Sequence, residues 1–269
     1  MSVAPTNLLS PLLDDQVERN KRRAMLMMAS LVVAVLVVVV ALGALIGAGA
    51  KSLVAGVIVA VVLALAAYRK SAALVLALCG ARLADPVEYA RLHNLVEGLC
   101  STAGLPKPGV YVVDDDALNA FATGRSPRHA AIVVTTGLVS RMNRIELEGL
   151  LAHELSHVKN RDTLVSTLAV TVVGPVTFLL PLPKVARLMH AAVGRRREAL
   201  ADLTGVSLTR YPPGLIAAME KLGDGTTVVQ SASRATAHLW LESPLSCKDG
   251  SRLHTHAPLE ERIAALREL

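Results

Sequence analysis

The pentapeptide His153-Glu154-Leu155-Ser156-His157 is the segment whose residue types and spacing point most directly to chemistry. On a helix, residues four apart lie on one face, so both imidazoles can bind one metal ion. Glu154 follows the first histidine and can reach a water molecule beside that ion. This H-E-x-x-H arrangement is typical of zinc peptidases. The spacing therefore predicts two zinc ligands, His153 and His157, with Glu154 as the general base.

The surrounding sequence predicts the helix that this spacing requires. Asn143 has the residue type of an N-cap, and Glu146 follows three residues later, as in a capping box. Apolar residues then recur at helical spacing, at Ile145, Leu147, Leu150, Leu151, Leu155 and Val158. We therefore expect the two histidines to lie beside a buried apolar stripe.

A third ligand must come from farther along the chain, because a catalytic zinc site has three protein ligands and one open position. Glu198 and Asp202 lie four residues apart on a second predicted helix, so they share a face. Glu198 is the candidate ligand, and Asp202 can accept a hydrogen bond from an imidazole N–H and fix its tautomer. Since three arginines precede this pair, a solvated helix face has the same spacing. Spacing alone leaves both interpretations open.

The chain is too apolar for an ordinary soluble domain. Hydrophobic residues make up 52% of its 269 residues, and its mean hydropathy is +0.47. Residues 24–50 carry no charge and are long enough to cross a bilayer, and residues 53–68 form a second uncharged stretch. A cleaved signal peptide is disfavoured, because the first stretch is too long and the second follows directly. We therefore predict a transmembrane helical hairpin over residues 24–70.

Basic residues flank this hairpin on both sides. They are Arg19, Lys21, Arg22 and Arg23 before the first span, and Arg69, Lys70 and Arg82 after the second. The connection between the spans holds only Lys51, so the positive-inside rule places both chain ends in the cytoplasm. Residues 1–23 are then a cytoplasmic N-terminal segment, and residues 71–269 form a domain that faces the cytoplasm. The flanks explain part of the net charge of +6, and with so few aromatic residues we expect no nucleic-acid partner. The three cysteines form no C-x-x-C pair and predict no disulfide framework.

The rest of the sequence predicts a small sheet beside the metal helix. Asp85-Pro86 opens a helix that runs to about Cys100, and strands are expected over residues 109–113, 119–124 and 130–136. An edge strand over 119–124 would bind an extended peptide through main-chain hydrogen bonds, although an ordinary structural strand has the same pattern.

The uncharged residues 163–183 are long enough for one membrane crossing. A single crossing would, however, separate Glu198 from the two histidines. We therefore expect this segment to be membrane-associated or buried, with a helical hairpin that turns near Gly174-Pro175.

The chain resembles the HtpX-type membrane metallopeptidases, within the wider Ste24-like family of gluzincins. The segments that carry the resemblance follow the N-terminal hydrophobic hairpin and are residues 103–108, 119–124, 134–138, 151–162, 197–202 and 255–263. The resemblance implies an α+β, mostly helical fold, in which a transmembrane hairpin precedes a zincin-like metallopeptidase domain with a small sheet. It also implies one Zn²⁺ per chain, held by His153, His157 and Glu198, with Glu154 as general base.

The same resemblance assigns substrate contacts. It implies that substrate binds to the edge strand formed by Asn119, Ala120, Phe121, Ala122 and Thr123. His256 and Arg262 would bind substrate or stabilise the oxyanion. The implied substrates are misfolded or excess membrane proteins, and the implied location is the bacterial cytoplasmic membrane.

The chain departs from the family pattern in three places. Ala257-Pro258 stands where the family has two prolines, and Leu200 stands where an aromatic or acidic residue is common. The region between the metal helix and Glu198 is short, which argues against four spans.

Two other functions stay open at this point. One is a non-enzymatic membrane adaptor with a structural zinc, closed by a fourth ligand such as His254, His256 or Cys247. The other is a prenyl-protein peptidase of the Ste24 type, which requires a larger membrane bundle than this hydropathy predicts.

Overall fold

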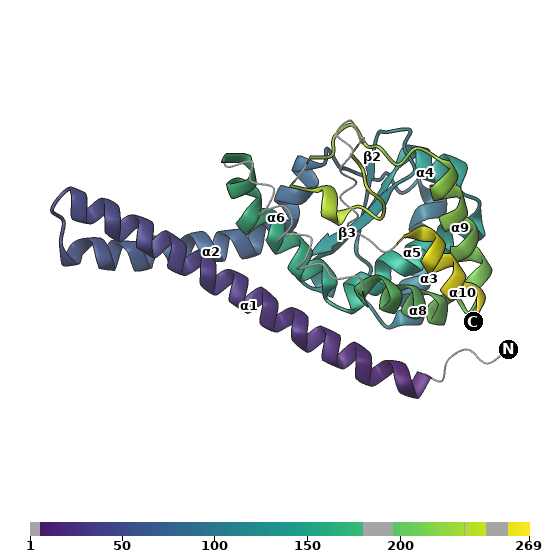
Figure 1. Ribbon diagram of the computed structural model, residues 1–269. Helices are drawn as coiled ribbons and strands as arrows, with labels where there is room; N and C mark the ends of the chain where they lie inside the picture. Colours follow the sequence, from purple (N-terminus) through teal and green to yellow (C-terminus); the bar gives the residue numbers. More distant parts are fainter. Residues whose placement is uncertain (1–5, 180–195, 234, 246–257) are drawn as a thin grey trace.

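The computed structural model describes residues 6–179, 196–233, 235–245 and 258–269 (Figure 1). As predicted, helices dominate, two apolar helices come first, and a small four-stranded sheet lies in the following domain. His256, which was expected to bind substrate or stabilise the oxyanion, lies outside the described residues, as do His254 and Cys247.

The first two helices form a hairpin of the predicted kind. Helix α1 spans Thr6–Leu45 and helix α2 spans Ala50–Leu78. Both are long and apolar enough to cross a membrane, and no other helix in the described ranges meets both criteria. Small residues four apart on α2, Ser52, Gly56, Ala60 and Ala64, are buried. A Cβ at Gly43 of α1 would lie 2.0 Å from the Cβ of Ser52, so these small residues allow the two helices to pack closely.

Helix α1 is longer than the uncharged stretch that predicted it. Its 40 residues are about 60 Å long, roughly twice the hydrocarbon thickness of a bilayer. The predicted N-terminal segment is therefore mostly the first part of this helix, which runs beside the domain in Figure 1. Its buried residues Gln16, Asn20 and Ala24 lie four apart on one face. Ala24 packs with Leu164 and Leu168 of helix α6 (Asp162–Leu179).

Helix α2 also continues past the predicted end of the hairpin and joins it to the domain. Val75 and the following Cys79 are fully buried. They belong to an apolar cluster with Phe121, Val133 and Trp240. The ring centroids of Phe121 and Trp240 are 4.7 Å apart in an edge-to-face contact. The end of the hairpin is thus part of the domain core.

The sheet has four strands in the order β1-β2-β4-β3. The strands are β1 (Arg82–Leu83), β2 (Gly109–Val113), β3 (Ala120–Gly124) and β4 (Ala130–Thr135). Strand β4 pairs parallel with β2 and antiparallel with β3, while β1 pairs antiparallel with β2. Alternate residues of β4 point to opposite faces. Ile132 and Val134 pack into the larger core with helices α3 (Ala90–Ala103) and α5 (Arg144–Lys159). Val133 packs toward α2 and Trp240.

The helices of the domain cover the sheet and one another. They are α3 (Ala90–Ala103), α4 (Thr136–Arg141), α5 (Arg144–Lys159), α6 (Asp162–Leu179), α8 (Arg196–Thr209), α9 (Pro212–Asp224) and α10 (Leu259–Arg267), with short 3₁₀ turns η1 (Pro127–His129) and η2 (Ala237–Leu239). Figure 1 shows α5 inside the domain, with α8, α9 and α10 at its outer side.

Two helical predictions differ from the structure. Helix α3 begins at Ala90 rather than near Asp85, because the Asp85 carboxylate accepts hydrogen bonds from the backbone N–H groups of Val87 and Glu88 and caps a separate turn.

Helix α6 runs through Gly174-Pro175 to Leu179, so the expected turn is not there. Gly174 lacks a Cβ, which removes one of the steric conflicts that disfavour helical conformation in a residue before proline. This segment was expected to be either membrane-associated or buried. Four apolar residues of α6 are buried, namely Leu164, Val165, Leu168 and Ala169.

Candidate metal centre

The metal helix α5 starts with the predicted cap. The side chain of Asn143 accepts hydrogen bonds from the backbone N–H groups of Ile145 and Glu146, at 2.9 and 3.0 Å. The Glu146 carboxylate accepts from the Asn143 N–H at 2.8 Å, which completes the capping box. This fixes where the helix begins, and with it which residues face the core.

Three side chains converge in the interior, as the sequence predicts. The Nε2 atoms of His153 and His157 are 3.2 Å apart. Glu198 lies on α8. Its Oε2 is 3.5 Å from His153 Nε2, and its Oε1 is 3.7 Å from His157 Nε2. All three residues are buried, and their candidate ligand atoms lie within 4.8 Å of one another. Glu198 is only 1% exposed, so it does not lie on a solvated helix face.

These distances fit a tetrahedral ion. Ligand atoms bound to zinc at about 2.0–2.1 Å are separated from one another by about 3.3 Å. The donor set of two imidazoles and one carboxylate matches the type found at catalytic zinc sites. The cluster is therefore able to bind a metal ion.

Helix α8 approaches α5 closely enough to bring Glu198 to the histidines. A Cβ at Gly205 would lie only 3.0 Å from the backbone N of His153. Any larger residue at this position would push the two helices apart. The glycine thus sets the distance between the helix that carries the histidines and the helix that carries Glu198.

The outer ring nitrogen of each histidine contacts a different carboxylate. His153 Nδ1 lies 2.8 Å from Asp202 Oδ1, and His157 Nδ1 lies 2.9 Å from Asp162 Oδ2. An Nδ1–H that donates to a carboxylate leaves the Nε2 lone pair directed at the metal position. Asp202 was predicted in this arrangement, whereas Asp162 was not.

Arg262 supports Asp202 from α10. Its Nε and Nη2 donate to both Asp202 oxygens, at 2.9 and 2.7 Å. Burial raises the pKa of Asp202, but the positive charge and hydrogen bonds of Arg262 outweigh this and lower it. Arg262 Nη1 is also 3.7 Å from Glu198 Oε2. Arg262 is 4% exposed and lies directly beside the candidate ligand Glu198.

Helix α1 supports Asp162 in a comparable way. The side-chain amides of Gln16 and Asn20 donate to Asp162 Oδ1, at 3.1 and 2.7 Å. Sequence reasoning missed all three residues. The one available signal is that Gln16, Asn20 and Ala24 are uncharged and four apart within a charged segment. This spacing places them on one helix face but does not specify that the face is buried.

Glu154 is buried beside the ligands. It is 2% exposed, and burial raises its pKa, against the opposing effect of the neighbouring histidines. Burial also disfavours the charged form of His157, but the Glu198 charge and the Asp162 hydrogen bond outweigh it and raise the pKa of His157 to about 9. The local charges thus favour a cation between the imidazoles and the carboxylates.

Comparison with known proteins places this site in a family. A model of peptidase family M48 matches residues 86–269. The chain belongs to this family. It is 38% identical over 239 residues to the protease HtpX homologue of Thermoanaerobacter pseudethanolicus, covering 76% of this chain and 80% of the relative. It is 32% identical over 299 residues to that of Streptococcus thermophilus, covering 96% of this chain and all of the relative. The resemblance inferred from the sequence is confirmed, and the chain is a membrane protease.

Strand β3 is the strand that was expected to hold substrate, and it lies at the edge of the sheet. The residues from Asn119 to Thr123 are all buried. By the register, Ala120 and Ala122 direct their backbone groups away from β4. The Ala120 carbonyl already accepts a hydrogen bond from the Leu241 N–H at 2.8 Å. The side chain of Asn119 also binds the segment that contains Leu241, by donating to the Glu242 carbonyl.

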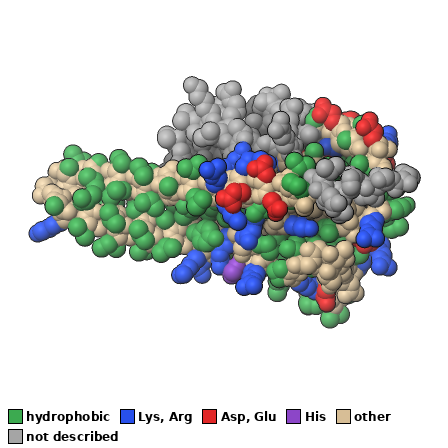
Figure 2. All heavy atoms as spheres, turned by 90° about the horizontal axis from the view of Figure 1, so that it is seen from below, with side chains coloured by type: hydrophobic (Ala, Val, Ile, Leu, Met, Phe, Trp, Pro, Cys, Tyr) green, Lys and Arg blue, Asp and Glu red, His purple; other side chains and the backbone are tan. Residues whose placement is uncertain are grey.

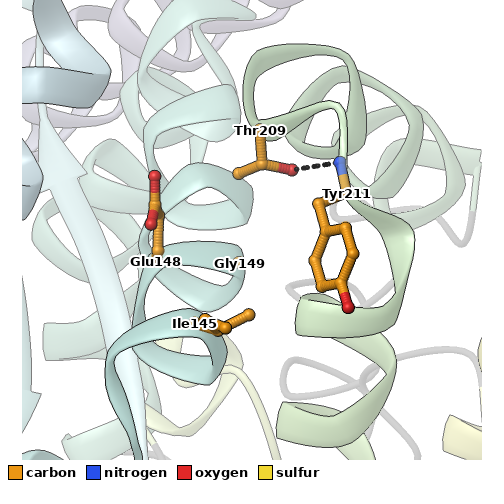
Figure 3. Close-up of a pocket in the computed structure, with 5 residues that line it drawn as sticks. All are labelled: Ile145, Glu148, Gly149, Thr209 and Tyr211. Atoms are coloured by element: carbon orange, nitrogen blue, oxygen red, sulfur yellow. Dashed lines mark hydrogen bonds between the residues drawn. The ribbon is translucent and has the colours of Figure 1, made fainter.

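A surface cavity of about 240 Å³ lies beside α5 but outside this M48 site. Figure 3 shows its lining residues, which are Ile145, Glu148, Gly149, Thr209 and Tyr211. The Tyr211 N–H donates to Thr209 Oγ1 at 3.3 Å and closes the connection between α8 and α9. None of the three cluster residues lines the cavity, so we assign it no part in the chemistry.

Proposed function

We propose that this M48 protease is a membrane-anchored zinc metalloendopeptidase. His153, His157 and Glu198 would hold one Zn²⁺ per chain, and Glu154 would act as general base. The convergence of the three buried side chains carries this proposal, because their separation and chemistry suit tetrahedral zinc. A catalytic zinc site with these three protein ligands would keep one tetrahedral position for reacting groups.

The chemistry is hydrolysis of a peptide bond. When bound, the zinc ion supplies Lewis-acid chemistry that polarises the scissile carbonyl and acidifies water. Glu154 accepts a proton from the attacking water as the new C–O bond forms. It then delivers that proton to the amine nitrogen as the C–N bond breaks. Its burial in an apolar interior raises its pKa, which suits a group that both accepts and returns a proton.

Substrate binding is proposed at β3 and near Arg262. An extended peptide would pair with the outer edge of Asn119 to Thr123, where Ala122 directs its backbone groups away from β4. Arg262 would act mainly by holding Asp202, since its guanidinium is bound to that carboxylate on two sides. His256 keeps its proposed role in binding substrate or the oxyanion.

The membrane hairpin supports a location at the bacterial cytoplasmic membrane, with the domain facing the cytoplasm. Figure 2 shows hydrophobic side chains covering the projecting arm, and Lys and Arg side chains where it meets the domain. This arrangement suits a multi-pass anchor under the positive-inside rule. The hairpin would hold the site beside the bilayer. Misfolded or excess membrane proteins are therefore the proposed substrates.

The experiment is cleavage of casein by the full chain in detergent, purified with chelator and assayed with and without zinc. Glu154→Gln is expected to keep zinc but lose activity by about 10²- to 10⁴-fold. Glu148→Gln is the matched control, since Glu148 lies on the same helix outside the cluster and is expected to keep its activity. Retained cleavage in Glu154→Gln would contradict the assigned base. Zinc-loaded parent protein that cleaves nothing would favour the adaptor with a structural zinc.

A further inference from the structure

Two buried amides lie on the part of α1 that precedes the apolar span. Gln16 is 9% exposed and Asn20 is 2% exposed, whereas Glu18 and Lys21 between and beside them face solvent. Burying a polar side chain is unfavourable unless it forms hydrogen bonds. Here both amides donate to the same oxygen of Asp162, and Asn20 also donates to the Asn160 carbonyl at 3.0 Å.

Asp162 joins α1 to the metal centre through its two oxygens. Oδ1 accepts the amides of Gln16 and Asn20, and Oδ2 lies 2.9 Å from His157 Nδ1. Asp162 is 2% exposed, so its charge depends on these donors in place of water. Two residues from the start of the chain thus fix the carboxylate that orients a predicted metal ligand.

The next turn of α6 reaches the third member of the cluster. Ser166 Oγ accepts a hydrogen bond from Arg197 at 2.8 Å, and Arg197 Nε donates to Glu198 Oε1 at 3.1 Å. Helix α6 itself packs on α1, where Ala24, Met27 and Met28 meet Leu164 and Leu168. The contact between α1 and α6 therefore helps to position both His157, through Asp162, and Glu198, through Ser166 and Arg197.

We propose that Gln16 and Asn20 are positioning residues of the metal centre. In this arrangement the first part of α1 orients His157 through Asp162, so the hairpin helix completes the site in addition to anchoring it. The inference rests on the proposed zinc site. It requires that metal affinity falls when the amide-to-carboxylate contact is broken, even though α1 supplies no ligand.

The test measures zinc per chain after dialysis against graded chelator, for full-length protein in detergent. Every variant is made in the Glu154→Gln background, which prevents self-cleavage and makes the readout independent of activity. Asn20→Asp places a carboxylate against Asp162 and is expected to weaken zinc retention on the order of 10–100-fold. Asn20→Ala is expected to have a smaller effect in the same direction. Glu18→Ala, on the exposed face of the same helix, is the control and is expected to match its parent.

A reciprocal exchange distinguishes a direct contact from general damage to the fold. Asn20→Asp combined with Asp162→Asn restores a donor–acceptor pair, with the amide N–H of residue 162 now donating to residue 20. Because Asp162→Asn weakens the contact with His157 on its own, the double variant is compared with both single variants. It is expected to lose less zinc affinity than the two single losses multiplied together, the coupling expected of groups in contact. Zinc retention in Asn20→Asp equal to its parent, or losses that multiply without coupling in the double variant, would overturn the inference. If the Glu154→Gln parent binds no zinc, the proposed zinc site itself fails.

Discussion

The two histidines of the metal centre are held by the same kind of contact from opposite parts of the chain. Each Nδ1 meets a carboxylate, at 2.8 Å for His153 and 2.9 Å for His157. Behind His153, Asp202 is bound by Arg262 of the C-terminal helix α10. Behind His157, Asp162 is bound by two neutral amides from the N-terminal helix α1.

The difference is one of charge and of connection. Arg262 is a buried cation in a two-point contact, which lowers the pKa of Asp202 and keeps this carboxylate ionised. The amides on α1 contribute hydrogen bonds without a charge, and they come from the helix that continues into the membrane span. The His153 side of the site therefore depends on the packing of the domain. The His157 side also depends on how the membrane hairpin sits against the domain.

The largest expected effect is at Arg262. Arg262→Met removes the cation that pairs with buried Asp202 and lies 3.7 Å from Glu198. Breaking a buried ion pair by removing one partner costs about 3–5 kcal/mol. We expect the free energy of unfolding, measured by denaturant titration in detergent, to fall by this amount.

Arg267→Met is the matched control for this prediction. Arg267 lies on the same helix and pairs with Glu220, but its side chain is 63% exposed. Exposed pairs contribute roughly 0–1 kcal/mol. Equal losses in the free energy of unfolding for the two variants would show that the buried pair of Arg262 and Asp202 does not stabilise the region around His153 more than an exposed pair does.

The second prediction compares the two carboxylates directly. Asp202→Asn and Asp162→Asn should each lower zinc affinity by about 10–100-fold, because each weakens the contact that orients an imidazole. Only Asp202→Asn removes the carboxylate that a buried arginine binds at two points, so it should also lower the free energy of unfolding by several kcal/mol. Chelator competition and denaturant titration measure the two effects separately. Similar losses in the free energy of unfolding for both variants would show that the arginine bound to Asp202 and the amides bound to Asp162 do not differ in the way proposed.

The half of the site around His153 could be predicted because its signals are local. His153 and His157 are four apart on α5, Glu198 and Asp202 are four apart on α8, and the capping box of α5 lies in one short segment. Helical geometry alone places such residues on common faces. What remained open was whether these faces meet, which depends on the close approach at Gly205.

The half around His157 could not be predicted because its contacts join distant segments. Gln16 and Asn20 lie among charged residues and read as part of a solvated segment, yet they are buried against Asp162, well over a hundred residues away. No periodicity in either segment specifies that pairing. The hydrogen bond from Leu241 to the edge of β3 is another contact between distant segments that the strand pattern did not indicate.

The smallest expected effect is at the helix start, which serves both histidines equally. Burial raises the pKa of Glu146, but the ammonium of Lys221 and the Asn143 N–H outweigh this and lower it. A carboxyl whose pKa is lower in the folded state stabilises above its unfolded pKa of about 4.3, and that contribution is lost as the pH falls through the folded value. Glu146→Gln keeps an oxygen that can accept from the Asn143 N–H but loses the charge that pairs with the half-exposed Lys221. It should therefore cost at most about 1 kcal/mol at pH 7 and converge with its parent once the pH falls below the lowered folded pKa. Thermal unfolding across pH measures this. Because α5 carries both histidines, zinc retention should change little, and a selective loss like that of Asp162→Asn would show that the cap acts on His157 alone.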